Sequence, residues 1–128
     1  MERERGKEAE LTERIIACAI AVHRELGPGL LESIYEEAMT VELANGGIQF
    51  VRQVEIPVVY KGTTLSGSFR VDMVVENKVV LELKTVESIL PVHEAQLLSY
   101  LRLGGWPTGL LLNFRSALLC NGIRRLVL

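Results

Sequence analysis

The stretch RVDMVVENKVVLELKTVE, residues 70–87, decides the fold of this chain. Apolar residues alternate with polar ones on both sides of Glu76–Lys78, which is typical of two antiparallel strands joined by a tight turn. Because strand side chains alternate between the faces of a sheet, Glu82 and Lys84 point to the same side. A carboxylate and an ammonium group are therefore expected on one face of the second strand.

The length of the turn determines whether Asp72 joins Glu82. If residues 76–78 form a three-residue loop, Asp72 lies directly opposite Glu82 on the same side of the sheet. If the loop has two residues, Asp72 faces Leu83 and the carboxylates separate unless a bulge restores them. Two carboxylates about 5 Å apart repel each other, whereas a divalent cation such as Mg²⁺ would hold them together. An exposed ion pair between Glu82 and Lys84, worth under about 1 kcal/mol, explains the same residue types, and both interpretations stay open.

A polar stripe follows the hairpin on a helix predicted over residues 91–103. His93, Gln96 and Tyr100 fall at i, i+3 and i+7 and so share one face of that helix. Such a stripe beside an acidic strand indicates a hydrated site. An ordinary helix–sheet boundary explains Gln96 and Tyr100 equally well, and His93 suits a hydrogen bond at the helix start better than a role as base or ligand.

The remaining elements follow from periodicity and from glycine and proline stops. We expect helices over residues 8–26 and 30–45, and strands over residues 48–60, 63–75, 79–86, 108–113 and 122–128. Pro57 favours an edge position or a bulge in the first strand. The last strand, IRRLVL, either completes the sheet or pairs across an interface. The predicted order is α-α-β-β-β-α-β-β.

Composition limits the class of protein. A chain of 128 residues fits one domain over residues 1–128, with residues 1–8 disordered or frayed. Apolar residues at 48% and charged residues at 23% exclude a disordered or low-complexity chain. The formal charge of −2 removes the strongest generic sign of nucleic-acid binding, a highly basic chain.

Cysteine usage and hydropathy indicate a soluble cytoplasmic protein. Cys18 and Cys120 lack C-x-x-C spacing, which excludes a zinc ribbon on these residues, and we expect both thiols to be buried and reduced. The longest apolar stretch, Ile15–Val22, is too short to span a bilayer, and the start of the chain is charged where a signal peptide is apolar.

Taken together, Asp72, Glu82-x-Lys84 and Gln96-x-x-x-Tyr100 resemble the PD-(D/E)XK nuclease superfamily, with the Q-x-x-x-Y helix of its RecB-like branch. The resemblance implies an α/β, restriction-endonuclease-like core with a central mixed β-sheet flanked by helices. It also implies catalytic roles for these five residues.

A closer resemblance lies at residues 29–35, GLLESIY, which are similar to the signature of the small GxxExxY protein family. The segments VHRELGPGLLESIYEEA, RQVEIPVVYKG, LELKTVE and PVHEAQLLSYLR extend it over nearly the whole chain. Val71 replaces the proline of the superfamily's name, but that proline is not a ligand. By motif position, Glu32 would join the strand carboxylates. If Gly29 is the N-cap, Glu32 at N3 also suits a capping role, and Tyr35 suits packing as well as a site.

The hypothesis is therefore Mg²⁺- or Mn²⁺-dependent hydrolysis of phosphodiester bonds in DNA or RNA. The metal would be held by Asp72, Glu82, the Leu83 carbonyl and Glu32. Lys84 would orient the attacking water or neutralise charge on the phosphate. Gln96 and Tyr100 would position the water shell or the backbone. The candidate phosphate contacts are basic residues, although solvated surface explains them better: Lys61, Arg70, Arg102, Arg115, Arg124 and Arg125.

Two alternatives remain at the level of the sequence. The chain could be a catalytically silent nuclease-fold module that binds nucleic acid or a protein partner, which its acidic charge favours. It could also cleave only within an assembly, because a chain this short has no separate specificity domain and a homodimer or partner could supply the missing contacts.

Overall fold

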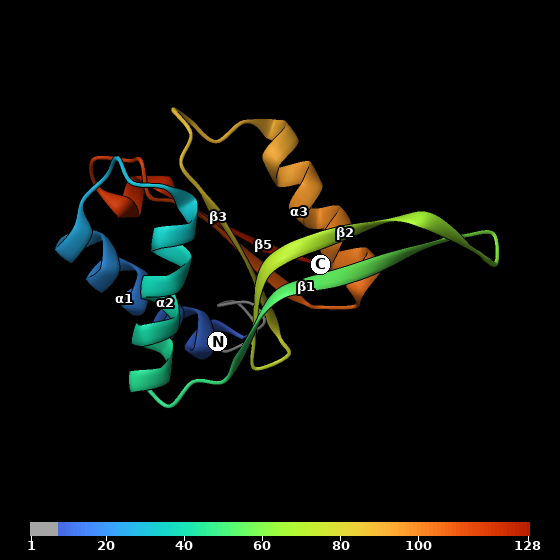
Figure 1. The fold of residues 1–128 in the computed structure, drawn as a ribbon, viewed down its shortest axis with the longest axis horizontal. Helices are drawn as coiled ribbons and strands as arrows, with labels where there is room; N and C mark the ends of the chain where they lie inside the picture. The colour runs from blue at the N-terminus through green and yellow to red at the C-terminus, as the bar shows by residue number, and fades with distance from the viewer. Residues whose placement is uncertain (1–7) are drawn as a thin grey trace.

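The structure, a computed structural model, describes residues 8–128 (Figure 1). The expectation that the start of the chain is frayed falls, for residues 1–7, outside the described residues. The helices are α1 (Ala9–Leu26), α2 (Glu32–Asn45), α3 (Pro91–Gly104) and the short 3-10 helix η2 (Leu119–Gly122). The strands are β1 (Phe50–Tyr60), β2 (Thr63–Val75), β3 (Val79–Lys84), β4 (Thr108–Asn113) and β5 (Ile123–Val127). Apart from η2, this is the predicted order.

The strands form one five-stranded sheet in the order β1-β2-β3-β4-β5. Neighbouring strands are antiparallel except β3 and β4, which are parallel and are connected by the α3 crossover. The sheet is therefore mixed, and β5 completes it at one edge. The opposite edge is β1, where the register shifts between Pro57 and Val59, so both the edge position and the irregularity expected at Pro57 are confirmed.

Helices cover both faces of the sheet. Helices α1 and α2 lie together on one side, and α3 lies on the other (Figure 1). The β3 side chains alternate between the two cores: Leu81 and Leu83 pack with α1 and α2, whereas Val80 packs with Leu97 and Leu101 of α3. Because side chains two residues apart share a face, Glu82 belongs to the α3 side.

The start of α2 differs from the prediction. The helix begins at Glu32, with Leu31 as N-cap and no capping side chain, so the proposed cap at Gly29 with Glu32 at N3 is wrong. A tertiary contact sets this start: the Tyr35 hydroxyl donates to the Gly27 carbonyl and accepts from the Leu30 amide. Tyr35 is fully buried and stacks on Phe114, with 4.5 Å between ring centroids.

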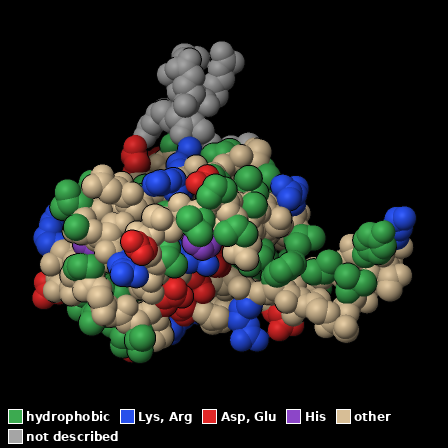
Figure 2. Space-filling model, turned by 90° about the horizontal axis from the view of Figure 1, so that it is seen from above, with side chains coloured by type: hydrophobic (Ala, Val, Ile, Leu, Met, Phe, Trp, Pro, Cys, Tyr) green, Lys and Arg blue, Asp and Glu red, His purple; other side chains and the backbone are tan. Residues whose placement is uncertain are grey.

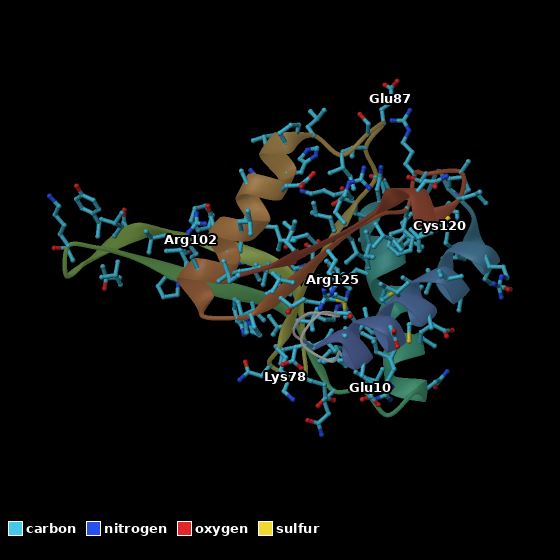
Figure 3. The ribbon with its side chains drawn as sticks, turned by 180° about the vertical axis from the view of Figure 1, so that it is seen from behind. Glu10, Lys78, Glu87, Arg102, Cys120 and Arg125 are labelled. Atoms are coloured by element: carbon cyan, nitrogen blue, oxygen red, sulfur yellow. The ribbon has the colours of Figure 1, made fainter. Side chains whose placement is uncertain are left out.

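The cysteine prediction is half right. Both cysteines are free, but Cys18 is only partly buried and Cys120 is exposed. Cys120 lies on η2, whose turn directs it away from the core (Figure 3). Within residues 8–128, none of the helices has both the length and the apolar character needed to cross a bilayer.

Candidate active site

The register of the β2–β3 hairpin brings the two strand carboxylates together. Met73 pairs with Leu81 and Val75 with Val79, which is the register of the three-residue loop. The next residues outward are Asp72 and Glu82. The register that brings Asp72 level with Glu82 is therefore confirmed.

The carboxylates lie where β2 and β3 separate. The two strands pair over only three residues each, after which β2 continues with β1 and β3 continues with β4. At this fork the Asp72 amide donates to Glu82 Oε1 at 3.0 Å, and the Leu83 amide donates to Asp72 Oδ2 at 2.7 Å. Two side chains thus take the place of main-chain ladder bonds, so one oxygen of each acid is fixed by backbone.

Burial and proximity perturb both acids. Glu82 is only 8% exposed. Burial, and after it the negative charge of Asp72, raises the pKa of Glu82 to about 7, against the opposing effects of the Asp72 amide and Lys84. Burial also raises the pKa of Asp72, with smaller contributions from Glu36 and Glu32. Protonation of the pair therefore competes with binding of a cation near neutral pH.

Lys84 lies on the same side of β3 as Glu82, as predicted, and is half-buried. Its positive charge lowers the pKa of both Asp72 and Glu82. It forms no ion pair within 4.0 Å with any residue of the described range 8–128, so it is not a partner in the simple surface ion pair considered above.

Helix α2 contributes two more acidic residues near Asp72 and Glu82. Glu32 is exposed, and its Oε2 lies 3.5 Å from the Thr85 hydroxyl, just beyond Lys84 on the chain. Its negative charge raises the pKa of both strand acids, which places it at the rim of the site. Glu36, one turn further along α2, raises the pKa of Asp72 as well.

Glu36 is a site residue that the sequence interpretation missed. It is 7% exposed and accepts hydrogen bonds from Arg52 Nε and Gln53 Nε2, both at 2.8 Å. Gln53 lies opposite Asp72 in the β1–β2 register and has a left-handed backbone, with φ of 50°. Glu36 thus ties α2 to the strand that flanks Asp72. The signal was available, because Glu36 is four residues after Glu32 and shares its helix face.

The sequence was compared with models of known protein families. A model of the PD-(D/E)XK nuclease superfamily matches residues 9–126. The chain belongs to the PD-(D/E)XK nuclease superfamily. No curated protein and no solved structure matches the chain. The mixed sheet flanked by helices is the restriction-endonuclease-like core that the resemblance implied.

The α3 residues of this superfamily member do not all reach the acids. Tyr100 is half-buried; burial, followed by the charges of Glu82 and Asp72, raises its pKa, so it lies near them. Gln96 is exposed, and no hydrogen bond joins it to the acidic pair. His93 Nδ1 accepts from the Leu90 amide at 2.9 Å, which confirms its role at the helix start.

The site fits a divalent cation through two acids rather than three. Within residues 8–128, no group of three His, Cys, Asp or Glu side chains lies close enough to hold a metal. Asp72 and Glu82 nevertheless each use only one carboxylate oxygen on backbone. Two adjacent carboxylates, one buried and one partly buried, are hard oxygen ligands with unbalanced charge, which is the chemistry that Mg²⁺ and Mn²⁺ prefer. Glu32 stays at the rim.

The basic residues considered for phosphate contact are spread over the molecule. Arg102 on α3 and Arg125 on β5 come from separate elements (Figure 3). Lys61 lies in the β1–β2 turn, where its Nζ is 5.5 Å from the Tyr60 ring centroid, and Arg70 pairs with Glu55 at 3.6 Å. Of the six basic residues, only Arg70 lies on β2, the strand that carries Asp72, and only Lys61 lies in the turn before it.

Proposed function

We propose that this chain is a metal-dependent nuclease that hydrolyses phosphodiester bonds of DNA or RNA with Mg²⁺ or Mn²⁺. The proposal is carried by one observation: the carboxylates of Asp72, which is partly buried, and Glu82, which is buried, lie side by side, and Lys84 lies on the same face of β3 as Glu82. Membership of the nuclease superfamily supports it. Without a counter-charge, such a pair costs stability.

Asp72 and Glu82 would be the metal ligands. Their backbone hydrogen bonds fix the orientation of each carboxylate before metal arrives, which reduces the reorganisation needed for binding. The Leu83 carbonyl would complete the protein ligands, and Glu32 would stay at the rim of the site. A bound divalent cation would polarise the scissile phosphate and lower the pKa of the attacking water.

The remaining side chains would act around that centre. Lys84, whose charge already acts on both acids, would orient the water or offset charge on the phosphate oxygens. Tyr100 would position the water shell or the nucleic-acid backbone from α3. Gln96 lies one turn earlier on the same helix face and would act only when substrate reaches it.

We also propose a subfamily, a domain organisation and a cellular compartment for the chain. The segment Gly29–Tyr35 supports the GxxExxY group within the superfamily, because Glu32 lies at the site rim and Tyr35 fixes the loop before α2. One sheet with two cores supports a single domain over residues 1–128. Two free cysteines fit a reducing compartment such as the cytoplasm.

The test is cleavage of single-stranded and duplex DNA and RNA with Mg²⁺ or Mn²⁺. We expect activity in the wild type that is lost in both Asp72→Ala and Lys84→Ala. Lys78→Ala is a matched control, because Lys78 is an exposed lysine of the same hairpin. Cleavage that is indifferent to both site substitutions would refute the assignment. Metal-independent binding without cleavage would favour the silent module instead.

A further inference from the structure

The β1–β2 hairpin projects beyond the rest of the molecule (Figure 1). β3 pairs with β2 only at residues 73–75, so residues 56–69, here called the projecting hairpin, pair only with each other. All residues from 61 to 70 are exposed. An isolated two-stranded hairpin is marginally stable in water, so this extension is costly unless something lies against it.

The projecting hairpin exposes large apolar side chains. The exposed fractions are 59% for Tyr60, 44% for Leu65 and 39% for Phe69. Phe69 pairs with Ile56, and alternation along β1 from Ile56 to Tyr60 places Phe69 and Tyr60 on one face. Leu65 lies in the part of β2 where the register shifts. Figure 2 shows hydrophobic side chains following the hairpin away from the body. Two of the three are aromatic rings, which offer flat faces to a partner.

The charge of this segment favours a polyanion. Between Ile56 and Val71 the sequence contains no acidic residue, but it contains Lys61 and Arg70, although the whole chain carries −2. Arg70 pairs with Glu55 at the root of the hairpin through an exposed contact of 3.6 Å, which water screens. A symmetric contact with a second copy would set these like charges against each other.

The same face leads to the acidic pair. Phe69 contacts Tyr100 of α3, with 5.2 Å between ring centroids, and Tyr100 lies near Glu82 and Asp72. β2 extends from Thr63 at the tip to Asp72 in the site, about 30 Å at the rise of a strand, with one register shift against β1 between Thr64 and Ser68. A chain laid along the hairpin would therefore enter the site.

We propose that the projecting hairpin binds a single-stranded segment of nucleic acid. Unpaired bases stack on Tyr60 and Phe69, and the phosphates lie against Lys61 and Arg70. A single strand is required because the bases of a duplex have no free faces for the rings. The inference rests on the proposed function for the identity of the substrate.

Binding is tested without cleavage, by fluorescence anisotropy in EDTA with single-stranded oligonucleotides of about 16 nucleotides and the matching duplex. We expect tighter binding of the single strand and about 10-fold weaker binding in Tyr60→Ser, with Tyr60→Phe close to wild type. Val59→Ser is the matched control, because Val59 is 57% exposed on the opposite face of the hairpin. Lys61→Gln is expected to reduce the salt slope of log K by about 0.7.

A small substrate separates this inference from the proposed function. We expect hydrolysis of bis(p-nitrophenyl) phosphate with Mn²⁺ to be unchanged in Tyr60→Ser and lost in Asp72→Asn. Loss of strand binding in Tyr60→Ser supports the hairpin even if the wild type cleaves nothing. Equal binding by Tyr60→Ser and wild type, preference for the duplex, or a dimer that Tyr60→Ser dissociates without any oligonucleotide binding would overturn it.

Discussion

Asp72 and Glu82 hold each other through the backbone: the Asp72 amide donates to Glu82 Oε1 at 3.0 Å, and the amide of Leu83, next to Glu82, donates to Asp72 Oδ2 at 2.7 Å. Each carboxylate is therefore fixed by the strand that carries the other. The arrangement keeps two negative groups together at the fork of β2 and β3, at a cost that protonation or a cation offsets.

This cost predicts an unusual pH dependence of stability without metal. Because the pKa of Glu82 is raised to about 7 from an ordinary 4.5, the folded protein holds a proton that the unfolded chain has released. Relative to Glu82→Gln, the wild type should lose up to about 3 kcal/mol of unfolding free energy between pH 4.5 and 7. Urea unfolding in EDTA at pH 5 and pH 8 measures it. Parallel pH profiles for the two proteins would contradict the raised pKa.

The substitution Asp72→Asn should stabilise the metal-free protein at pH 8. Asparagine keeps an oxygen that can accept from the Leu83 amide, but it removes the charge that raises the pKa of Glu82. The expected gain is about 1 kcal/mol, together with loss of metal-dependent cleavage. Thermal unfolding in EDTA measures the gain. A destabilised Asp72→Asn would mean that the two acids do not repel each other in the folded protein.

Glu36→Ala should destabilise the fold by about 2 kcal/mol, because it leaves Arg52 and the left-handed Gln53 without their shared acceptor. Glu37→Ala, an exposed neighbour on the same helix, should change stability by less than about 0.5 kcal/mol. Urea unfolding compares the two. Equal effects would remove Glu36 from the support of the site.

Tyr35→Phe should lower stability by about 1 kcal/mol and leave the rate of cleavage unchanged, because the hydroxyl bonds only to the loop at Gly27 and Leu30. Tyr60→Phe is the exposed control and should change neither quantity. Full stability with lost cleavage would instead assign Tyr35 a role in the reaction.

Alternation and turn signals were enough to predict the order of the elements along the chain and the antiparallel hairpin, and to reduce the position of Asp72 to two registers. The choice between them could not be made from the sequence. The observed loop places Glu76 and Asn77 at positive φ, 53° and 55°, a conformation for which glutamate gives no local signal. Residues distant in sequence contact this loop: the Gln49 amide donates to Glu76 Oε2, and the Trp106 indole donates to Asn77 Oδ1.

The errors have the same origin. The start of α2 is set by the Tyr35 hydroxyl, which bonds residues earlier in the chain, and a local capping rule does not include such a contact. Glu36 was not singled out, because Arg52 and Gln53, which donate to it, lie 16 and 17 residues further along the chain. Pairing of β2 with β3 over only three residues also had no sequence signal, so the projecting hairpin was not expected.

The most direct test of the account is a calorimetric titration of Mn²⁺ into wild type, Asp72→Asn and Glu82→Gln at pH 7.5, with Glu55→Gln, an exposed acid of β1, as control. We predict saturable binding in the wild type and the control, with proton release from the acidic pair, and loss of binding in both site variants. Wild-type protein that takes up no Mn²⁺, or site variants that bind it as tightly as the wild type, would contradict the claim that Asp72 and Glu82 form a metal site.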